Sequence, residues 1–270
     1  SAISQFNRSE DTAWFSVSTS FVHVVQSAQR ISELSLGAYD ITLGPLVELW
    51  GFGAKMTADG QDLVPSDNDI AAVLATLGYG KLTVQEQPPA LRKALPELRI
   101  DLSSIAKGYA VDVIADYLES AGAQDYLVEI GGELRASGLS ARQDDWRIAV
   151  EKPVVGERSI QRVIALKDMS VATSGDYRNF FEQQGKRYSH MIDAKTGKPV
   201  THNLASVTVL SPKAMDADGW ATALMALGED AGYELADQQN IAAYFIYRDG
   251  SGVFQTKETK AFTKIAGSNV

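Results

Sequence analysis

A carboxylate and a hydroxyl four residues apart form one of the clusters in this sequence whose residue types and spacing suggest chemistry. Asp218 and Thr222 lie in the run 215–222, and residues four apart share one face of a helix. Oxygen donors placed in this way are ligands that Mg²⁺ accepts. An acidic residue in a first helical turn also stabilises the helix dipole, which gives Asp216 and Asp218 a purely structural reading. The spacing leaves both readings open.

A second cluster, Asp101-Leu102-Ser103-Ser104-Ile105-Ala106-Lys107-Gly108, has the pattern of a strand end that runs into a helix start. Free backbone N–H groups, a carbonyl and the Lys107 ammonium converge at such a place, and a phosphate or a flavin edge fits there. The structural alternative is an ordinary N-cap with Lys107 in solvent.

His190 is the best general-base candidate of the three histidines. It lies in a strand-like run where a period of two places it on one face with Tyr188 and Ile192. By contrast, His23 falls within an amphipathic helical pattern and His202 within a polar loop. A structural, hydrogen-bonding role for His190 stays open.

Ser174 and Asp176, in the run 171–177, suggest a tight turn or a nucleotide-binding loop, with a plain Asx turn as the alternative. The sequence contains no Gly-x-Gly-x-x-Gly, Walker A, His-Glu-x-x-His or Gly-x-Ser-x-Gly motif. The commonest phosphate, protease and esterase signatures are therefore missing.

Helices and runs of consecutive strands must position these residues. Apolar periodicity and capping residues predict helices over 18–36, 46–50, 68–77, 104–121, 213–227 and 229–238. Alternation predicts strands over 82–84, 126–130, 133–137, 146–151, 160–166, 187–192, 204–210, 241–247 and 252–256. The polar stretch 86–98 reads as a surface connection. Clustered strands without strict β-α-β alternation indicate an α+β fold with a largely antiparallel sheet, in one domain over 1–270.

Composition narrows the classes of partner. The 270 residues are 45% hydrophobic, and 25 basic against 34 acidic residues give a net charge of −9. This balance argues against a nucleic-acid-binding protein with a broad basic face, so an anionic ligand needs a local device such as a metal ion. No apolar run approaches the roughly 18 residues needed to cross a bilayer. The absence of cysteine excludes disulfides, thiolate nucleophiles and zinc ribbons.

Taken in order, eight segments of the chain resemble the ApbE family, the Mg²⁺-dependent FAD:protein FMN transferases. These segments are Ser1-Ala2-Ile3-Ser4-Gln5-Phe6-Asn7, Gly37-Ala38-Tyr39-Asp40, 44–53, 101–109, Gly131-Gly132-Glu133, 172–177, Tyr188-Ser189-His190 with Asp193 and Thr196-Gly197, and Ala217-Asp218 with Ala221-Thr222-Ala223-Leu224. They spread over residues 1–228, so the resemblance implies an ApbE-like fold for the chain.

The resemblance also implies site residues. It implies a Mg²⁺ site made by the side chains of Asp218 and Thr222 and by the backbone carbonyl of Ser104. It implies that FAD is contacted by Ala38, Tyr39, Asp40, Asp101, Lys107 and the backbone near Ile192.

The family reaction breaks the pyrophosphate of FAD. A Thr or Ser hydroxyl of an acceptor protein attacks the FMN phosphorus, AMP leaves, and a phosphoester-linked flavin remains. His190 is a candidate to accept the hydroxyl proton, with Asp193 or a nearby carboxylate orienting the ring. Two other hypotheses use the same metal site: a Mg²⁺-dependent FAD pyrophosphatase that gives FMN and AMP, and a flavin-binding protein without turnover.

The family further implies a partner and a location. Acceptors carry a motif like Asp-x-x-Ser/Thr-Gly-Ala-Thr/Ser, typically in subunits of membrane redox pumps. The expected location is the periplasmic side of the bacterial inner membrane, with membrane attachment only through a lipid anchor upstream of residue 1. Family members usually begin with a further segment that carries a Met-Gly-Thr-like motif, so this chain is expected to lack it.

Overall fold

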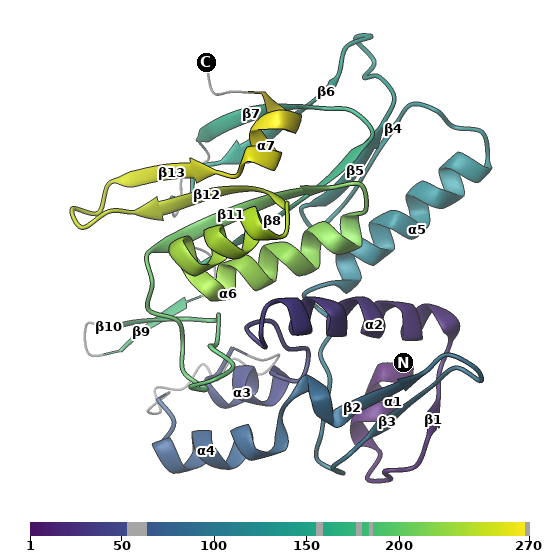
Figure 1. Cartoon of the computed structure of the whole chain (residues 1–270), viewed down its shortest axis with the longest axis vertical. Helices are drawn as coiled ribbons and strands as arrows, with labels where there is room; N and C mark the ends of the chain where they lie inside the picture. The colour runs from purple at the N-terminus through teal and green to yellow at the C-terminus, as the bar shows by residue number, and fades with distance from the viewer. Residues whose placement is uncertain (53–63, 155–158, 177–179, 184–185, 268–270) are drawn as a thin grey trace. The chain divides into compact units, whose positions relative to one another are not determined.

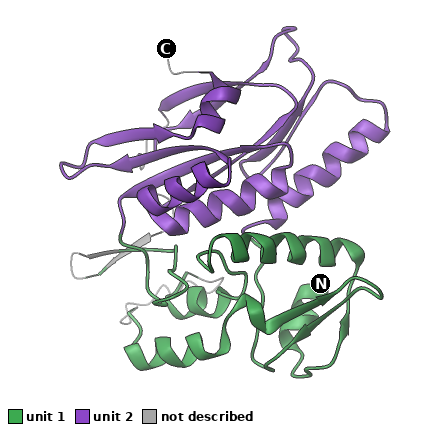
Figure 2. Cartoon of the chain, viewed as in Figure 1, with its two compact units in different colours: residues 1–103, 179–201 green, residues 104–178, 202–270 purple. Residues whose placement is uncertain are grey.

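The computed structural model describes residues 1–52, 64–154, 159–176, 180–183 and 186–267 (Figure 1). The chain divides into two compact units (Figure 2). Unit 1 comprises Ser1–Ser103 and Asn179–Thr201, and unit 2 comprises Ser104–Arg178 and His202–Val270. The described strands pair antiparallel throughout. The predicted α+β class with antiparallel sheet is therefore confirmed, whereas the single domain over 1–270 stays a prediction.

Unit 1 combines short helices with two small sheets. Its helices are α1 (Ala2–Arg8), α2 (Thr19–Leu34), α3 (Gly44–Leu49), α4 (Asp67–Thr76) and the 3₁₀ helix η1 (Tyr79–Lys81). Its strands are β1 (Phe15–Ser16), β2 (Leu82–Gln85), β3 (Ala90–Lys93), β9 (Phe180–Gln183) and β10 (Lys186–Ser189), in the orders β1-β3-β2 and β10-β9. Ser18 and Ser66 cap α2 and α4 by accepting hydrogen bonds from backbone N–H groups. The sequence alone leaves Ser20 open as the cap of α2 and Asn68 as the cap of α4.

The stretch 86–98 is wrongly predicted as a surface connection, because it contains β3. Leu91 and Lys93 of this strand are buried. The Lys93 ammonium donates to the carbonyl oxygens of Pro96 at 2.8 Å and Phe6 at 3.3 Å, and burial lowers its pKa. A lysine surrounded by carbonyl groups can be buried, which its residue type alone does not indicate.

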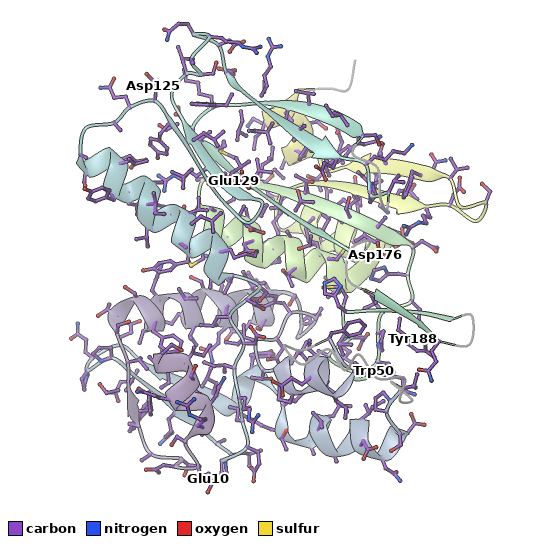
Figure 3. The ribbon with its side chains drawn as sticks, turned by 180° about the vertical axis from the view of Figure 1, so that it is seen from behind. Glu10, Trp50, Asp125, Glu129, Asp176 and Tyr188 are labelled. Atoms are coloured by element: carbon purple, nitrogen blue, oxygen red, sulfur yellow. The ribbon has the colours of Figure 1, made fainter. Side chains whose placement is uncertain are left out.

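A small apolar cluster fixes residues 188–197 within unit 1. The Trp50 indole donates to the carbonyl oxygen of Gly197 at 2.8 Å and stacks on Tyr188 with ring centroids 5.7 Å apart (Figure 3). Gly197 has a φ of +67°, and a Cβ there would lie 2.6 Å from Cγ2 of Ile70. Ile192 belongs to the same buried cluster. The loop that follows β10 is therefore packed against α3 and α4.

Unit 2 is built on a six-stranded sheet in the order β13-β12-β11-β8-β5-β4. Its strands are β4 (Tyr126–Ile130), β5 (Glu133–Ser137), β8 (Met169–Gly175), β11 (Leu204–Ser211), β12 (Ala242–Arg248) and β13 (Phe254–Glu258), with a separate hairpin of β6 (Trp146–Glu151) and β7 (Ile160–Leu166). Its helices are α5 (Ala106–Ser120), α6 (Ala214–Gln238) and α7 (Lys260–Ala266). None of the described helices of the chain is long and apolar enough to cross a membrane.

The sheet of unit 2 is covered on both faces (Figure 1). Helix α6 packs on one face, where Tyr233 meets Phe245 of β12 edge to face. On the other face, Tyr244 of β12 packs in one apolar cluster with Ile164 of β7 and Phe262 of α7. Because both faces are covered, β11 is buried along nearly its whole length.

Two segments of unit 2 form elements that differ from the predicted ones. The loop predicted over 171–177 is wrong, because residues up to Gly175 form β8 between β5 and β11. The helices predicted over 213–227 and 229–238 form the single element α6, with a break at Gly228 where φ is +84°. Tyr177 and Gly53, which the family resemblance includes, lie outside the described residues.

Helices α5 and α6 approach each other closely at Gly108. A Cβ on this residue would lie 2.2 Å from the carbonyl oxygen of Ala214 and 2.8 Å from Cβ of Asp218. Only glycine fits between these two helices without moving backbone.

We therefore predict that Gly108→Ala destabilises the protein by about 3 kcal/mol, since the added methyl must displace one helix. Replacing glycine by alanine inside a helix otherwise stabilises a protein by roughly 0.5–1 kcal/mol. The sign of the change in the free energy of unfolding therefore shows whether the two helices are in close contact. Urea unfolding measures the change. The control is Gly250→Ala, because a Cβ at Gly250 meets nothing within 4 Å. Equal stability of the two variants would contradict the close approach.

Candidate functional site

Asp218 is a buried carboxylate at the N-terminal end of α6, with 3% of the residue exposed. Its Oδ2 accepts a hydrogen bond from the Gly108 backbone N–H at 3.0 Å. The Lys107 ammonium lies 3.2 Å from its Oδ1 and 3.4 Å from its Oδ2. Burial raises the pKa of Asp218, and the Lys107 charge opposes that shift. The carboxylate is thus held by the first turn of α5.

The cap of α5 differs from the predicted one. The Asp101 carboxylate accepts from the Ser103 backbone N–H at 2.8 Å and makes a local turn, and the N-cap residue Ile105 has no side-chain hydrogen bond. The carboxylate of Asp218 instead accepts from the helix start. Capping by Asp101 and its neighbours was predicted because they precede the helix, whereas the group that caps it comes from 110 residues away.

Glu133 is a second buried carboxylate, and its sequence motif Gly131-Gly132-Glu133 predicts no role for it. Its Oε1 lies 2.7 Å from the Lys107 ammonium. Its Oε2 is buried and has no hydrogen-bond partner among the described residues. Burial raises the pKa of Glu133. Burial also disfavours the charged form of Lys107, but the adjacent Asp218 and Glu133 carboxylates outweigh it and raise the Lys107 pKa. Two buried carboxylates therefore share one ammonium.

Hydroxyl oxygens lie on the same helix and on a neighbouring strand. Thr222 follows Asp218 by one turn of α6, as predicted, and its Oγ1 is 3.5 Å from Oγ of Ser174 in β8. Ser104 lies in the turn before α5. Carboxylate, hydroxyl and carbonyl oxygens form a donor set that suits a hard divalent cation.

The unpartnered oxygen of Glu133 and the excess of carboxylate over ammonium also fit a cation. Across the described ranges, no group of three or more His, Cys, Asp or Glu side chains could hold a metal. The predicted Mg²⁺ site needs only the one carboxylate of Asp218, so this finding and the prediction are compatible.

Unit 1 holds the predicted flavin contacts Ala38, Tyr39, Asp40, Asp101 and Ile192, whereas Lys107 lies in unit 2. The Asp40 carboxylate accepts from the backbone N–H groups of Thr42 and Tyr79, each at 2.8 Å, and from the Thr42 hydroxyl at 2.7 Å. Burial raises its pKa. The Asp101 backbone N–H donates to the carbonyl oxygen of Ile41 at 2.7 Å. The structure therefore brings Asp101 beside the loop that carries Ala38, Tyr39 and Asp40, and Asp40 itself shapes that loop.

His190 follows the end of β10 and does not lie within the strand. Its ring centroid is 6.3 Å from that of Phe52, at 71°. Ile192 forms an isolated bridge with Pro199. The prediction that His190 and Ile192 share one strand face is therefore wrong, because β10 ends at Ser189. The proton-accepting role of His190 stays a prediction.

Asp193 organises the turn that follows. Its Oδ1 accepts from the backbone N–H groups of Lys195 at 2.7 Å and Thr196 at 2.8 Å. This is an Asx-type turn, and it gives Asp193 a structural role in the loop. Its predicted action on the ring of His190 stays a prediction.

His202 lies in a loop, as predicted, and is half-buried, with both ring nitrogens enclosed. Its ring packs on the break in α6, where a Cβ on Gly228 would lie 2.7 Å from Cδ2 of His202. Its Nδ1 is 3.9 Å from a Glu229 oxygen. Burial lowers the pKa of His202. This histidine has a structural role at the helix break.

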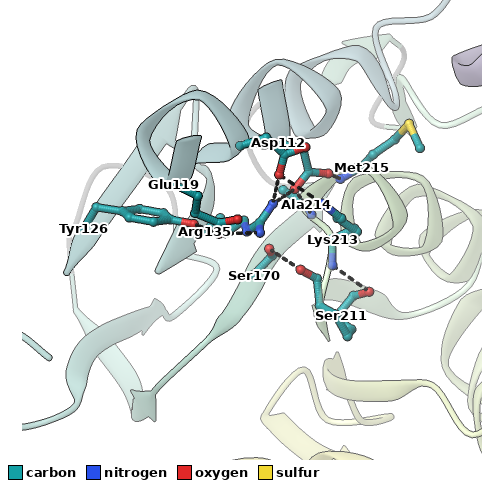
Figure 4. Close-up of polar contacts among 11 residues, drawn as sticks. Asp112, Glu119, Tyr126, Arg135, Ser170, Ser211, Lys213, Ala214 and Met215 are labelled. Atoms are coloured by element: carbon teal, nitrogen blue, oxygen red, sulfur yellow. Dashed lines mark hydrogen bonds and ion pairs between the residues drawn. The ribbon is translucent and has the colours of Figure 1, made fainter. Parts of the chain in front are cut away.

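The N-terminus of α6, which carries Asp218, is itself held by α5 (Figure 4). Asp112 of α5 accepts from the backbone N–H of Ala214 at 3.0 Å and of Met215 at 2.9 Å. Arg135 of β5 donates to the same carboxylate at 3.2 Å. The N-cap residue Lys213 has no side-chain cap of its own, so Asp112 satisfies the free N–H groups of the helix. Asp112 carries no local sequence signal for this role, because its partners are 102 and 103 residues away.

Arg135 links Asp112 to the surface of α5. It also donates to Asp116 and Glu119, each at 2.8 Å. The Tyr126 hydroxyl donates to Glu119 at 2.5 Å, and burial raises the pKa of Tyr126 to about 12 (Figure 4). These contacts hold the Arg135 side chain in place beside Asp112.

Comparison with known proteins agrees with this fold. The family model described as "ApbE family" matches residues 1–245. The chain is 48% identical over 252 residues to the FAD:protein FMN transferase of Vibrio cholerae, covering 93% of this chain and 74% of that protein. It is 45% identical over 269 residues to the enzyme of that name from Haemophilus influenzae, covering 98% and 77%.

Solved structures give the same result. The flavin transferase ApbE from Vibrio cholerae has a TM-score of 0.88 at 45% identity, covering 98% of this chain and 82% of that one. The apo flavinyl transferase ApbE from Pseudomonas stutzeri has a TM-score of 0.88 at 42% identity, covering 100% and 82%. The molecule is thus an α+β protein with a buried acidic cluster at a helix start. It belongs to the ApbE family.

We predict that Asp112→Asn lowers the free energy of unfolding by about 2 kcal/mol, because one acceptor oxygen becomes a donor that faces other donors. Chemical denaturation measures the loss. Asp116→Asn is the matched control, because Asp116 also pairs with Arg135 but its side chain is 55% exposed. An exposed ion pair contributes less than about 1 kcal/mol. Equal losses in the two variants would refute the capping role of Asp112.

Proposed function

We propose that this chain is a Mg²⁺-dependent FAD:protein FMN transferase. It joins the FMN moiety of FAD to a Ser or Thr of an acceptor protein through a phosphoester bond and releases AMP. The observation that carries the proposal is the buried Asp218 carboxylate, with Thr222 one helical turn away and Glu133 sharing its counter-ion. Membership of the ApbE family and the names of its relatives support the same activity.

The proposed metal ligands are the side chains of Asp218 and Thr222 and the backbone carbonyl of Ser104. When Mg²⁺ is bound, it supplies the positive charge that pyrophosphate oxygens need during phosphoryl transfer. The residues supply rigid placement, because Asp218 is fixed to α5 by the Gly108 N–H. A chain with a net charge of −9 then binds an anion through a local device.

The remaining proposed roles concern the flavin and the proton. Ala38, Tyr39, Asp40, Asp101, Lys107 and the backbone near Ile192 are proposed to contact FAD. His190 is proposed to accept the proton of the attacking hydroxyl, since an imidazole titrates near neutral pH. Family resemblance supports these assignments.

The acceptor and the location are also proposals. By the same resemblance, the acceptor carries an Asp-x-x-Ser/Thr-Gly-Ala-Thr/Ser motif in a membrane redox-pump subunit. We further propose action at the periplasmic side of the inner membrane, with the full-length protein lipid-anchored.

Incubation of the protein with FAD, Mg²⁺ and an acceptor fragment bearing this motif tests the proposed reaction. We expect the intact mass of the acceptor to rise by one FMN, with equimolar AMP, and EDTA to abolish both. A fragment with its acceptor Ser or Thr changed to Ala is the control and should stay unmodified. AMP with free FMN and no adduct would indicate a pyrophosphatase. FAD binding without AMP would indicate a flavin-binding protein.

We predict that His190→Ala slows flavin transfer by about 10²–10⁴-fold, the usual contribution of a general base. FAD affinity, measured by equilibrium dialysis, should change by less than about threefold if the residue acts on the proton alone. His23→Ala is the control, since His23 is exposed on α2. Transfer by His190→Ala at the wild-type rate would remove His190 from the mechanism.

A further inference from the structure

Lys107 lies between two buried carboxylates of unit 2. Its Nζ is 2.7 Å from Oε1 of Glu133 and 3.2 Å from Oδ1 of Asp218. The side chains of Glu133 and Asp218 are 6% and 4% exposed, whereas that of Lys107 is 40% exposed. The ammonium is the mobile partner of the three, because its long stem is partly in solvent and the carboxylates are enclosed.

The charges in this cluster do not balance. Two carboxylates face one ammonium, and Oε2 of Glu133 is buried without a hydrogen-bond partner among the described residues. An enclosed carboxylate oxygen without a partner is costly. The free Oε2 of Glu133 can therefore accept a further hydrogen bond from the Lys107 ammonium. Asp218 already has this ammonium beside it.

The backbone leaves room for the Lys107 stem next to Glu133. A Cβ on Gly131 would lie 3.3 Å from Cδ of Lys107 and 3.7 Å from Oε2 of Glu133. Gly131 has a φ of +62°, which favours glycine in the turn between β4 and β5. The lysine stem can thus stay beside Glu133 when its ammonium no longer contacts Asp218.

We propose that Lys107 is a built-in counter-ion that competes with the metal. In the metal-free protein its ammonium neutralises Asp218, and when a divalent cation binds Asp218 the ammonium is retained by Glu133 alone. This inference rests on the proposed metal role of Asp218. It assigns Lys107 and Glu133 as positioning residues that tune metal affinity.

Calorimetric titration with Mg²⁺ alone, on the whole chain without FAD, tests the competition. Lys107→Met keeps the stem and removes the charge. We expect its Kd for Mg²⁺ to fall on the order of tenfold or more, because a competing charge a few ångströms away is gone. Its melting temperature in EDTA should drop below that of wild type, and Mg²⁺ should raise it by more than in wild type.

Lys213→Met is the matched control. Lys213 has a similar exposure of 47% and pairs with Asp116 at 3.1 Å, and among the described residues it makes no ion pair with Asp218. Its Kd for Mg²⁺ should stay within about threefold of wild type, since exposed charges are screened. An equal gain in affinity in both variants would show a general charge effect and overturn the proposal.

Glu133→Gln gives a second variant, which is measured alone and in the Lys107→Met background. It leaves the ammonium with Asp218 alone, so the Kd for Mg²⁺ should rise several-fold. In the Lys107→Met background the same change should have a smaller effect, because Glu133 acts through the lysine. Equal effects in both backgrounds would mean that Glu133 contacts the metal itself, and the proposal would be wrong.

The outcomes separate this inference from the proposed function. If wild type binds Mg²⁺ and Asp218→Asn does not, the metal site stands. An unchanged or weaker affinity in Lys107→Met then overturns only the competition. If wild type itself binds no Mg²⁺, the metal site fails and the competition fails with it.

Discussion

The structure of unit 2 depends on two helices that cap each other, each with a carboxylate from the other helix. Asp218 of α6 accepts from the backbone at the start of α5, and Asp112 of α5 accepts from the backbone at the start of α6. Each carboxylate satisfies N–H groups that a helix leaves free at its N-terminus, and each lies where the helix dipole favours negative charge. This reciprocal capping requires the two helices to be in contact, which is why a glycine, Gly108, lies between them. The capping fixes Asp218 through a residue that is distant from it in the sequence.

This arrangement explains how an acidic residue can be both structural and functional. From the sequence, a helix-stabilising Asp218 and a metal-binding Asp218 are alternatives. In the structure Oδ2 accepts from the Gly108 backbone N–H at 3.0 Å, and the Lys107 ammonium lies 3.2 Å from Oδ1 and 3.4 Å from Oδ2. The backbone N–H therefore fixes the side chain, while both of its oxygens lie near a cation. A ligand held in this way loses little conformational entropy when a metal binds, which favours affinity.

The sequence predicts features that depend on near neighbours. The caps Ser18 and Ser66, each as one of two candidates, the α+β class and the helix that carries Asp218 and Thr222 follow from local patterns. Features that depend on distant partners do not. The sequence of β8 is predicted to be a loop, because its small polar residues form a central strand only when β5 and β11 flank it. Glu133, Asp112 and the buried Lys93 acquire their roles only from partners far along the chain. The family resemblance marked Glu133 by its segment but could not indicate its contact with Lys107.

The most direct test of the metal role of Asp218 is the location of the ion. Mn²⁺ accepts the same oxygen ligands as Mg²⁺ and scatters anomalously, so a crystal grown with Mn²⁺ locates the site independently of activity. We predict an anomalous peak within coordinating distance of the Asp218 carboxylate and the Thr222 hydroxyl, with the Lys107 ammonium on Glu133. A peak that does not contact Asp218, or an Asp218 still paired with Lys107 at saturating Mn²⁺, would contradict the assignment.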